Sequence, residues 1–197
     1  IDMLTKEICV MSFHPALLLI DIQQGFADPR WGARNQPDAE QNMAALLDFW
    51  RRQHWPRYHI RHDSLLPDSP LRPGQPGNDF QPIVAPLPGE TVVPKTVNSA
   101  FIGTDLDKQL CAAGISRLVI AGLTTNHCVS TTTRMAGNLG YDTVVVADAT
   151  ATFALTGPDG RRHDASLVHD LALANLHGEF ATVLPTAQLL MQMRSEL

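Results

Sequence analysis

The chain has 197 residues, of which 44% are hydrophobic and 18% charged, and its formal net charge at pH 7 is −5. This composition is typical of a soluble globular domain with a substantial core, and it excludes a disordered chain. The acidic balance, without any cluster of lysine or arginine, argues against nucleic acid as a partner. The longest apolar runs have the length of strands, so we also expect no membrane-spanning segment.

Six short apolar runs predict the strands of a sheet, at residues 16–20, 58–61, 91–95, 118–121, 143–147 and 180–184. Apolar residues at helical spacing predict helices at residues 39–53, 104–113, 127–139, 161–176 and 187–194. Strands that alternate with helices imply a mostly parallel sheet that is covered on both faces. We therefore predict an α/β fold, a doubly wound, Rossmann-like α/β/α sandwich with a six-stranded sheet.

The boundary of the folded domain is predicted between residues 12 and 13. Met11-Ser12 comes just before the first predicted strand, so residues 1–12 are interpreted as an N-terminal extension that can be upstream or vector-derived sequence. Residues 13–197 are predicted to form a single domain. The start of the chain lacks a signal-peptide pattern.

Two loops differ in their composition from the rest of the chain. Residues 23–37 are polar and contain prolines, and they hold Phe26 and Trp31. Residues 65–90 contain seven prolines and three glycines. So many breakers in a compact domain predict a long ordered loop of the kind that often covers a site. A disordered linker is the alternative, but no second domain exists for it to connect.

The three cysteines, Cys9, Cys111 and Cys128, are widely spaced and odd in number. This pattern predicts no disulfide framework, and it favours a reducing compartment, the cytoplasm. Cys128 follows the predicted strand at residues 118–121, where Gly122 allows a tight turn before a helix. The N–H groups and the dipole of a helix N-terminus favour a thiolate and attract an anionic oxygen. The alternative is that Cys128 is a small apolar core residue.

Three reactive side chains follow or end predicted strands: Asp21, Lys95 and Cys128. Ligands of such sheets bind outside the carboxyl ends of the strands. An acid, an amine and a thiol that converge there can activate a nucleophile. Asp148 also follows a predicted strand, but an acid in that position can equally cap a neighbouring helix.

The same segments resemble the isochorismatase-like cysteine hydrolases. The resemblance extends from about residue 15 to residue 190 and includes all three members of the family's Asp-Lys-Cys triad. It is carried by Leu19-Ile-Asp21-Ile-Gln23 with Phe26, by Lys95 with Asn98-Ser-Ala-Phe101, and by Gly122-Leu-Thr-Thr-Asn-His-Cys128-Val129 with Thr132 and Arg134. The segments Gly140-Tyr141, Asp148-Ala149 and Glu179-Phe180-Ala181 also fit.

The resemblance implies a role for each member of the triad. Asp21 is expected to act as the general base for Cys128, and Lys95 to hold the ion pair and favour the thiolate. Cys128 is expected to attack a carbonyl, with the oxyanion held by the backbone N–H groups of Thr124 and Cys128. Family members have a cis peptide just before the first of these donors, and we predict one here between Leu123 and Thr124.

No metal or other cofactor is predicted. The nicotinamidases of this superfamily have an Asp-x-His pair after the second strand and a further histidine. Here the corresponding residues are His59-Ile-Arg61-His62-Asp63, and no histidine follows until His127. The order is wrong and the third ligand is missing. His62 is expected either to face the site or to stabilise a loop.

The complete triad favours hydrolysis of a small-molecule C–N bond, in an amide, lactam or carbamoyl group, through a thioester. One alternative is cleavage of a vinyl ether, as in true isochorismatases, several of which lack the cysteine. A second alternative is a non-catalytic binding or scaffold member of the superfamily. The long proline-rich loop also resembles that of the lactam-opening members. We expect a small-molecule substrate and a homodimer or larger homo-oligomer.

The substrate pocket is predicted to use side chains of the loops beside the triad. These are Phe26, Trp31, Phe101, Asn126 and His127. The alternative for the aromatic residues is ordinary loop packing, since pockets and cores use the same side chains. His127 is expected either to reach the substrate or to cap the helix. Arg61 and Arg72 are candidates for binding a substrate carboxylate.

Overall fold

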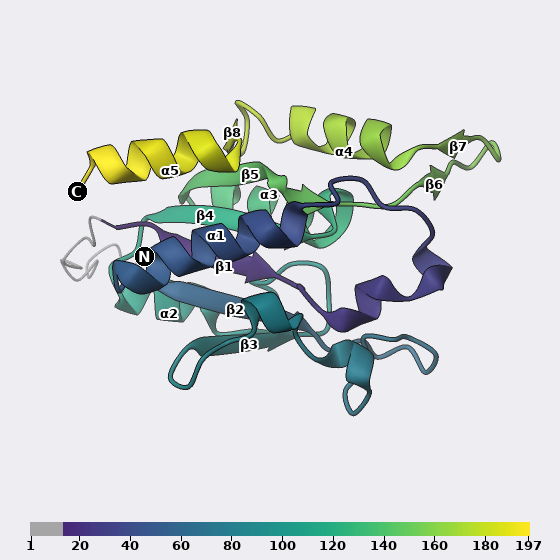
Figure 1. Cartoon of the computed structure of the whole chain (residues 1–197), viewed down its shortest axis with the longest axis horizontal. Helices are drawn as coiled ribbons and strands as arrows, with labels where there is room; N and C mark the ends of the chain where they lie inside the picture. Colours follow the sequence, from purple (N-terminus) through teal and green to yellow (C-terminus); the bar gives the residue numbers. More distant parts are fainter. Residues whose placement is uncertain (1–13) are drawn as a thin grey trace, which may run out of the picture.

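The computed structural model describes residues 14–197 and has a six-stranded parallel sheet in the order β3-β2-β1-β4-β5-β8 (Figure 1). The strands are β1 (Ala16–Ile20), β2 (Arg57–His62), β3 (Thr91–Lys95), β4 (Arg117–Leu123), β5 (Asp142–Ala151) and β8 (Thr182–Leu184). The helices are α1 (Ala39–Arg52), α2 (Leu106–Ala112), α3 (Ser130–Asn138), α4 (Ala165–Ala174) and α5 (Thr186–Ser195). The predicted α/β fold is confirmed. The expectation for residues 1–12 lies outside the described residues.

Strand β1 is apolar throughout because it lies inside the sheet and is covered on both faces. All five of its residues are buried, because alternate side chains enter two different cores. Leu17 and Leu19 pack with α1 and α5, and Leu18 and Ile20 pack with α2 and α3 on the other face. The sheet therefore forms the middle layer of three. None of the helices within residues 14–197 is both long and apolar enough to cross a bilayer.

The strand predicted at residues 143–147 is longer than expected. Strand β5 continues to Ala151, with a register shift against β4 after the pair Ile120 and Val145. Asp148 lies inside this irregular part of β5 and not at a strand end. Its carboxylate accepts hydrogen bonds of 2.7 Å from both the backbone N–H and the hydroxyl of Thr186. It therefore caps α5, which is the alternative role that the sequence left open.

The prediction of a helix from residue 161 was wrong in its first turn. Residues 162 and 163 form β7 (Arg162–His163), which pairs with β6 (Leu155–Thr156) in a short antiparallel hairpin that projects from the body (Figure 1). Helix α4 begins only after Asp164, whose side chain accepts a 2.8 Å hydrogen bond from the Leu167 N–H. The N-cap thus fixes the helix start at Ala165, four residues later than the apolar spacing indicated.

The proline-rich loop is ordered and lies at the carboxyl end of the sheet, beside the 3-10 helix η1 (Gln24–Ala27) (Figure 1). The side chain of Gln23 bonds to both backbone groups of His62, at 2.9 and 3.1 Å, and to the Asn78 carbonyl at 2.9 Å. A Cβ atom on Gly77 would lie 2.3 Å from the Pro70 carbonyl oxygen, so this turn of the loop requires glycine. The loop is therefore fixed against the segment that follows β1.

Candidate active site

The structure brings Asp21, Lys95 and Cys128 together at the carboxyl end of the sheet. The Lys95 ammonium lies 2.6 Å from Asp21 Oδ2 and 3.3 Å from Cys128 Sγ. The side chains of Asp21 and Lys95 are fully buried, and Cys128 is 8% exposed. Because a buried charge is stable only when it is paired, the two charged side chains form one neutral unit beside the thiol.

The backbone around β1 determines where the Asp21 carboxylate points. Asp21 has a φ of 52°, in the left-handed region that aspartate tolerates better than most residues. Its N–H donates to the Ile60 carbonyl at 2.9 Å, which ties the turn to β2. On the other side, a Cβ atom on Gly122 would lie 2.0 Å from the Ile20 carbonyl oxygen. Glycine at 122 is therefore what lets β4 approach β1 just before the cysteine segment.

Cys128 belongs to a single wide helical turn that precedes α3. This π-helical turn, η5 (Thr125–Val129), follows β4 after one extended residue, Thr124. The carbonyl of Thr124 accepts hydrogen bonds from the N–H groups of His127, at 3.1 Å, and Val129, at 3.2 Å. The Leu123–Thr124 peptide is cis, as predicted. The expected strand-to-helix junction is present, with a π-turn in place of a regular first turn.

The electrostatics favour a protonated Cys128 in the resting protein. Burial raises the pKa of the thiol, and the Asp21 carboxylate raises it further, while Lys95 opposes the shift. Since the Asp21–Lys95 pair is already neutral, a thiolate would add an uncompensated negative charge to a buried site. Desolvation and the Asp21 carboxylate therefore oppose the thiolate that the helix N-terminus and Lys95 favour.

One oxygen of Asp21 is poised to accept a proton. Lys95 occupies Oδ2, whereas Oδ1 is buried and has no hydrogen-bond partner among the described residues. Burial raises the pKa of Asp21, although the nearby Lys95 opposes that rise. A buried carboxylate that has one oxygen without a partner, and an oxygen within 4.8 Å of the thiol sulfur, has the properties of a general base.

The same cluster contains a potential set of metal ligands, but it does not fit a metal ion. Ligand atoms of Asp21, His62 and Cys128 lie within 4.8 Å of one another. The Lys95 ammonium, however, lies within 2.6, 3.0 and 3.3 Å of those three side chains. A divalent cation at this point would lie against a buried ammonium. His59 is committed elsewhere, since its Nε2 lies 2.9 Å from Glu90 Oε2.

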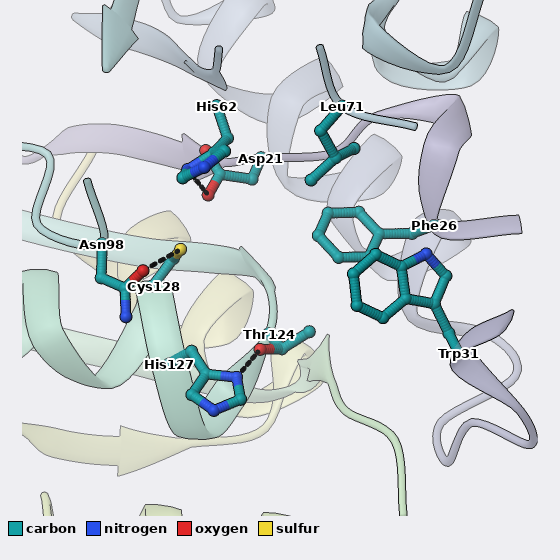
Figure 2. Close-up of a pocket in the computed structure, with 9 residues that line it drawn as sticks. All are labelled: Asp21, Phe26, Trp31, His62, Leu71, Asn98, Thr124, His127 and Cys128. Carbon is teal, nitrogen blue, oxygen red and sulfur yellow. Dashed lines mark hydrogen bonds and ion pairs between the residues drawn. The ribbon is translucent and has the colours of Figure 1, made fainter. Parts of the chain in front are cut away.

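A cavity of about 300 Å³ opens above the thiol, and Figure 2 shows the side chains that line it. Four of these residues are predicted from the sequence: Phe26, Trp31 and His127 as pocket residues, and Thr124 as a donor to the oxyanion. The His127 ring lies beside the Thr124 hydroxyl, with 3.1 Å between Nδ1 and Oγ1. The lining is completed by Asp21, His62, Leu71, Asn98 and Cys128.

Two predicted pocket residues, Phe101 and Asn126, lie outside this lining. Phe101 packs against the core cluster on the α2 and α3 face, and its ring stacks on Tyr141 with 5.9 Å between ring centroids. The side-chain oxygen of Asn126 accepts a hydrogen bond from the Thr152 hydroxyl, and Asn126 lines a separate groove beside α4. Phe101 is thus a packing residue, whereas Phe26 and Trp31 pack against Phe153 and also line the cavity.

Three lining residues were not assigned to the pocket from the sequence: His62, Leu71 and Asn98. His62 Nδ1 lies 3.0 Å from the Lys95 ammonium, and burial followed by Lys95 lowers its pKa to about 4. His62 is therefore neutral, and its Nδ1 accepts a hydrogen bond from the Lys95 ammonium. Its position at the carboxyl end of β2 was the signal that favoured a place in the site. No local signal distinguishes Leu71 within the loop.

Neither arginine considered for carboxylate binding reaches the cavity. Arg61 forms a two-bond ion pair with Asp63, at 2.8 and 3.0 Å. Arg72 is exposed on the long loop and does not line the cavity. Neither side chain is therefore placed in this structure to bind a substrate carboxylate in the cavity.

Comparison with known proteins agrees with this geometry. Residues 15–188 match the family model of the isochorismatase domain. The chain is 46% identical over 180 residues to the isochorismatase family protein YrdC of Bacillus subtilis, across 91% of this chain and 96% of that protein. It is 34% identical over 148 residues to a streptothricin hydrolase of Streptomyces noursei, across 73% and 52% of the two chains. A solved isochorismatase family structure from Chromobacterium violaceum matches with a TM-score of 0.89 and 52% identity, across 91% and 93%.

Proposed function

The chain belongs to the isochorismatase family of hydrolases, and we propose that it cleaves a C–N bond of a small amide, lactam or carbamoyl compound through a thioester on Cys128. The observation that carries this proposal is the position of the Lys95 ammonium, which contacts both the Asp21 carboxylate and the Cys128 sulfur. A carboxylate and an ammonium fixed beside a buried thiol supply a base and a counter-charge for a nucleophile.

In the first step, Asp21 Oδ1 takes the proton of the thiol while the sulfur attacks the substrate carbonyl carbon. The negative charge moves to the carbonyl oxygen, which is held by the backbone N–H groups of Thr124 and Cys128. The Lys95 ammonium stays bonded to Asp21 and offsets the charge that develops on sulfur. This transfer explains how a thiol with a raised pKa can react: it ionises only as the C–S bond forms.

In the second step, the tetrahedral intermediate collapses and the C–N bond breaks. Asp21 returns its proton to the leaving nitrogen, and the acyl group remains on Cys128 as a thioester. Asp21 then removes a proton from a water molecule, which attacks the thioester carbon and releases the acid. The sulfur regains the proton from Asp21, so the protein returns to its starting state.

The relatives include an amidohydrolase, which supports an amide-type substrate. A ureidoacrylate amidohydrolase of Variovorax paradoxus is 46% identical to this chain over 76 residues, and streptothricin hydrolase, by its name, hydrolyses streptothricin. Cleavage of a vinyl ether is the second candidate, because the isochorismatase family model covers the domain. That reaction would not require Cys128, whereas the sulfur here lies at the floor of the cavity, in contact with Lys95.

The test is a hydrolysis screen of the wild type and the Cys128→Ser variant with and without a chelator. The panel holds carbamoyl compounds, ureides, lactams, nicotinamide and isochorismate, and Cys111→Ser serves as the control because Cys111 is an exposed cysteine on α2. We expect amide turnover that is lost only in Cys128→Ser and is insensitive to chelator. Isochorismate turnover that survives in Cys128→Ser would replace the proposal with the vinyl ether reaction, and absence of any turnover would favour a binding role.

A further inference from the structure

We propose that the substrate is an amide without negative charge whose flat apolar part lies against the rings of Phe26 and Trp31. This inference rests on the proposed C–N hydrolysis and adds the chemical class of the substrate. It comes from two properties of the cavity, the charge of its lining and the shape of one wall (Figure 2).

The described lining offers no positive charge to an anionic substrate. The ammonium nearest to the cavity, that of Lys95, is fully buried and paired with Asp21. Burial lowers the pKa of both lining histidines, to about 4 for His62, so both are neutral near pH 7. Among the described residues that line the cavity, Asp21 is the one ionised group. A substrate carboxylate would therefore be desolvated without a partner, close to another carboxylate.

The wall formed by Phe26 and Trp31 is aromatic and held in place, with the planes of the two rings tilted by 39° to each other. The two ring centroids are 5.5 Å apart, and Phe153 packs against both rings at 6.2 and 5.9 Å. The indole N–H of Trp31 donates a 2.8 Å hydrogen bond to the Gly25 carbonyl, which fixes the rotation of the indole. Figure 2 shows both rings on one side of the cavity, with Cys128 and Asn98 on the opposite side. Offset stacking on such rings favours planar groups over puckered ones.

The size of the cavity limits the rest of the molecule. About 300 Å³ is at the small end of the range for ligand sites. Leu71 closes the side of the cavity formed by the long loop, and only 6% of its surface is exposed. A single ring with a short arm to the carbonyl carbon fills this space. The carbonyl reaches the sulfur while the ring remains on the aromatic wall.

The test uses matched pairs of amides that differ in one property. Phenylacetamide is compared with 4-carboxyphenylacetamide for charge and with cyclohexylacetamide for flatness; 2-pyrrolidinone is compared with pyroglutamate as a ring-amide pair. We expect kcat/KM to favour the neutral member by at least about 100-fold. Trp31→Leu should lower kcat/KM for phenylacetamide roughly 3- to 10-fold and leave cyclohexylacetamide nearly unchanged, and Trp31→Phe should restore most of the loss.

A gain of charge provides the complementary test. Leu71→Arg places a cation in the lining and should raise turnover of 4-carboxyphenylacetamide relative to phenylacetamide at least tenfold; Trp31→Arg is the second variant if Leu71→Arg does not fold. Leu155→Ala, in the projecting hairpin, is the control and should change neither ratio. Equal or faster turnover of the carboxylated members by the wild type would overturn the inference.

The inference can fail separately from the proposed function. Binding of the same pairs to Cys128→Ser, measured by calorimetry, reports selection without chemistry, and we expect the neutral members to bind at least tenfold more tightly. If Cys128 forms an acyl-enzyme, seen by intact mass, but the carboxylated members bind and react better, the function stands and the inference is wrong. If the neutral members bind better but no acyl-enzyme forms on any amide, the proposed function is wrong and the selection against charge stands.

Discussion

Replacing Lys95 with methionine should lower the free energy of unfolding by an amount that grows with pH, because the Asp21 carboxylate loses its partner. The side chain of Asp21 is fully buried, and its ion-pair partner is the Lys95 ammonium at 2.6 Å. Removing one partner of a buried pair typically costs about 3–5 kcal/mol, because the other charge remains buried. Methionine fills most of the volume of the lysine stem, so the lost charge dominates over the lost packing.

The structure sets an upper limit to this loss, because Asp21 can take up a proton instead of remaining ionised. Protonating a group with the ordinary aspartate pKa of 3.8 at pH 7 costs (7 − 3.8) × 1.36, or about 4 kcal/mol. In the variant, the folded-state pKa of Asp21 lies well above its unfolded value. The free energy of unfolding of Lys95→Met is therefore not reduced by this group below about pH 3.8. Above that pH it falls by about 1.4 kcal/mol per pH unit until the folded-state pKa of Asp21 is reached.

The assay is urea unfolding of the wild type and Lys95→Met at pH 4.5, 5.5 and 7. We expect a difference of at most about 1 kcal/mol at pH 4.5, since burial already raises the Asp21 pKa in the wild type, and a rise to at most about 4 kcal/mol at pH 7. The double variant Asp21→Asn/Lys95→Met is the control, since it removes both charges and should recover most of the stability. A pH-independent difference, or a double variant as unstable as Lys95→Met, would refute the ion-pair explanation.

Two further predictions concern the segment that carries the cysteine. Gly122→Ala should destabilise the protein by more than 4 kcal/mol in urea unfolding, because the new Cβ would lie 2.0 Å from the Ile20 carbonyl oxygen. Gly140→Ala is the control: Gly140 also has a positive φ, of 90°, but its Cβ would have nothing within 4 Å, so the loss should be only about 1 kcal/mol. Equal losses in the two variants would contradict the steric argument. His169→Leu should lower kcat at least tenfold with little change in KM, because the buried ring Nδ1 lies 2.8 Å from the Thr125 hydroxyl at the start of η5. His169→Asn can keep that bond and should recover kcat, and no difference between the two variants in kcat would remove the positioning role.

The sequence was sufficient to predict the sheet and the convergence of Asp21, Lys95 and Cys128, because both follow from short-range patterns. An apolar run of strand length defines each strand, and the carboxyl ends of parallel strands meet at one edge. The pocket lining was predicted less well, because loop side chains take their direction from tertiary packing. Leu71 reaches the cavity through a loop that is fixed by Gln23, and Phe101 turns away because Tyr141 offers a ring to stack on.

The protonation state of Cys128 could not be predicted from the sequence for a related reason. A helix N-terminus and a lysine both favour a thiolate, and both are visible in the sequence. The opposing effects are the burial of the sulfur and the closeness of the Asp21 carboxylate, which exist only in the folded protein. The equilibrium between thiol and thiolate at Cys128 therefore depends on how far the Asp21 carboxylate already neutralises the Lys95 ammonium.

That neutrality connects the chemistry of the thiol to the choice of substrate. With Asp21 and Lys95 paired, the site has no positive charge left over, either to stabilise a resting thiolate or to hold a substrate carboxylate. Both properties should therefore change together in Leu71→Arg, which adds a cation without touching the pair. We expect the pH profile of Cys128 alkylation by iodoacetamide, measured in a Cys111→Ser background, to shift to lower pH in that variant as carboxylated amides become acceptable. A gain of carboxylate turnover with an unchanged alkylation profile would show that the two properties have separate causes.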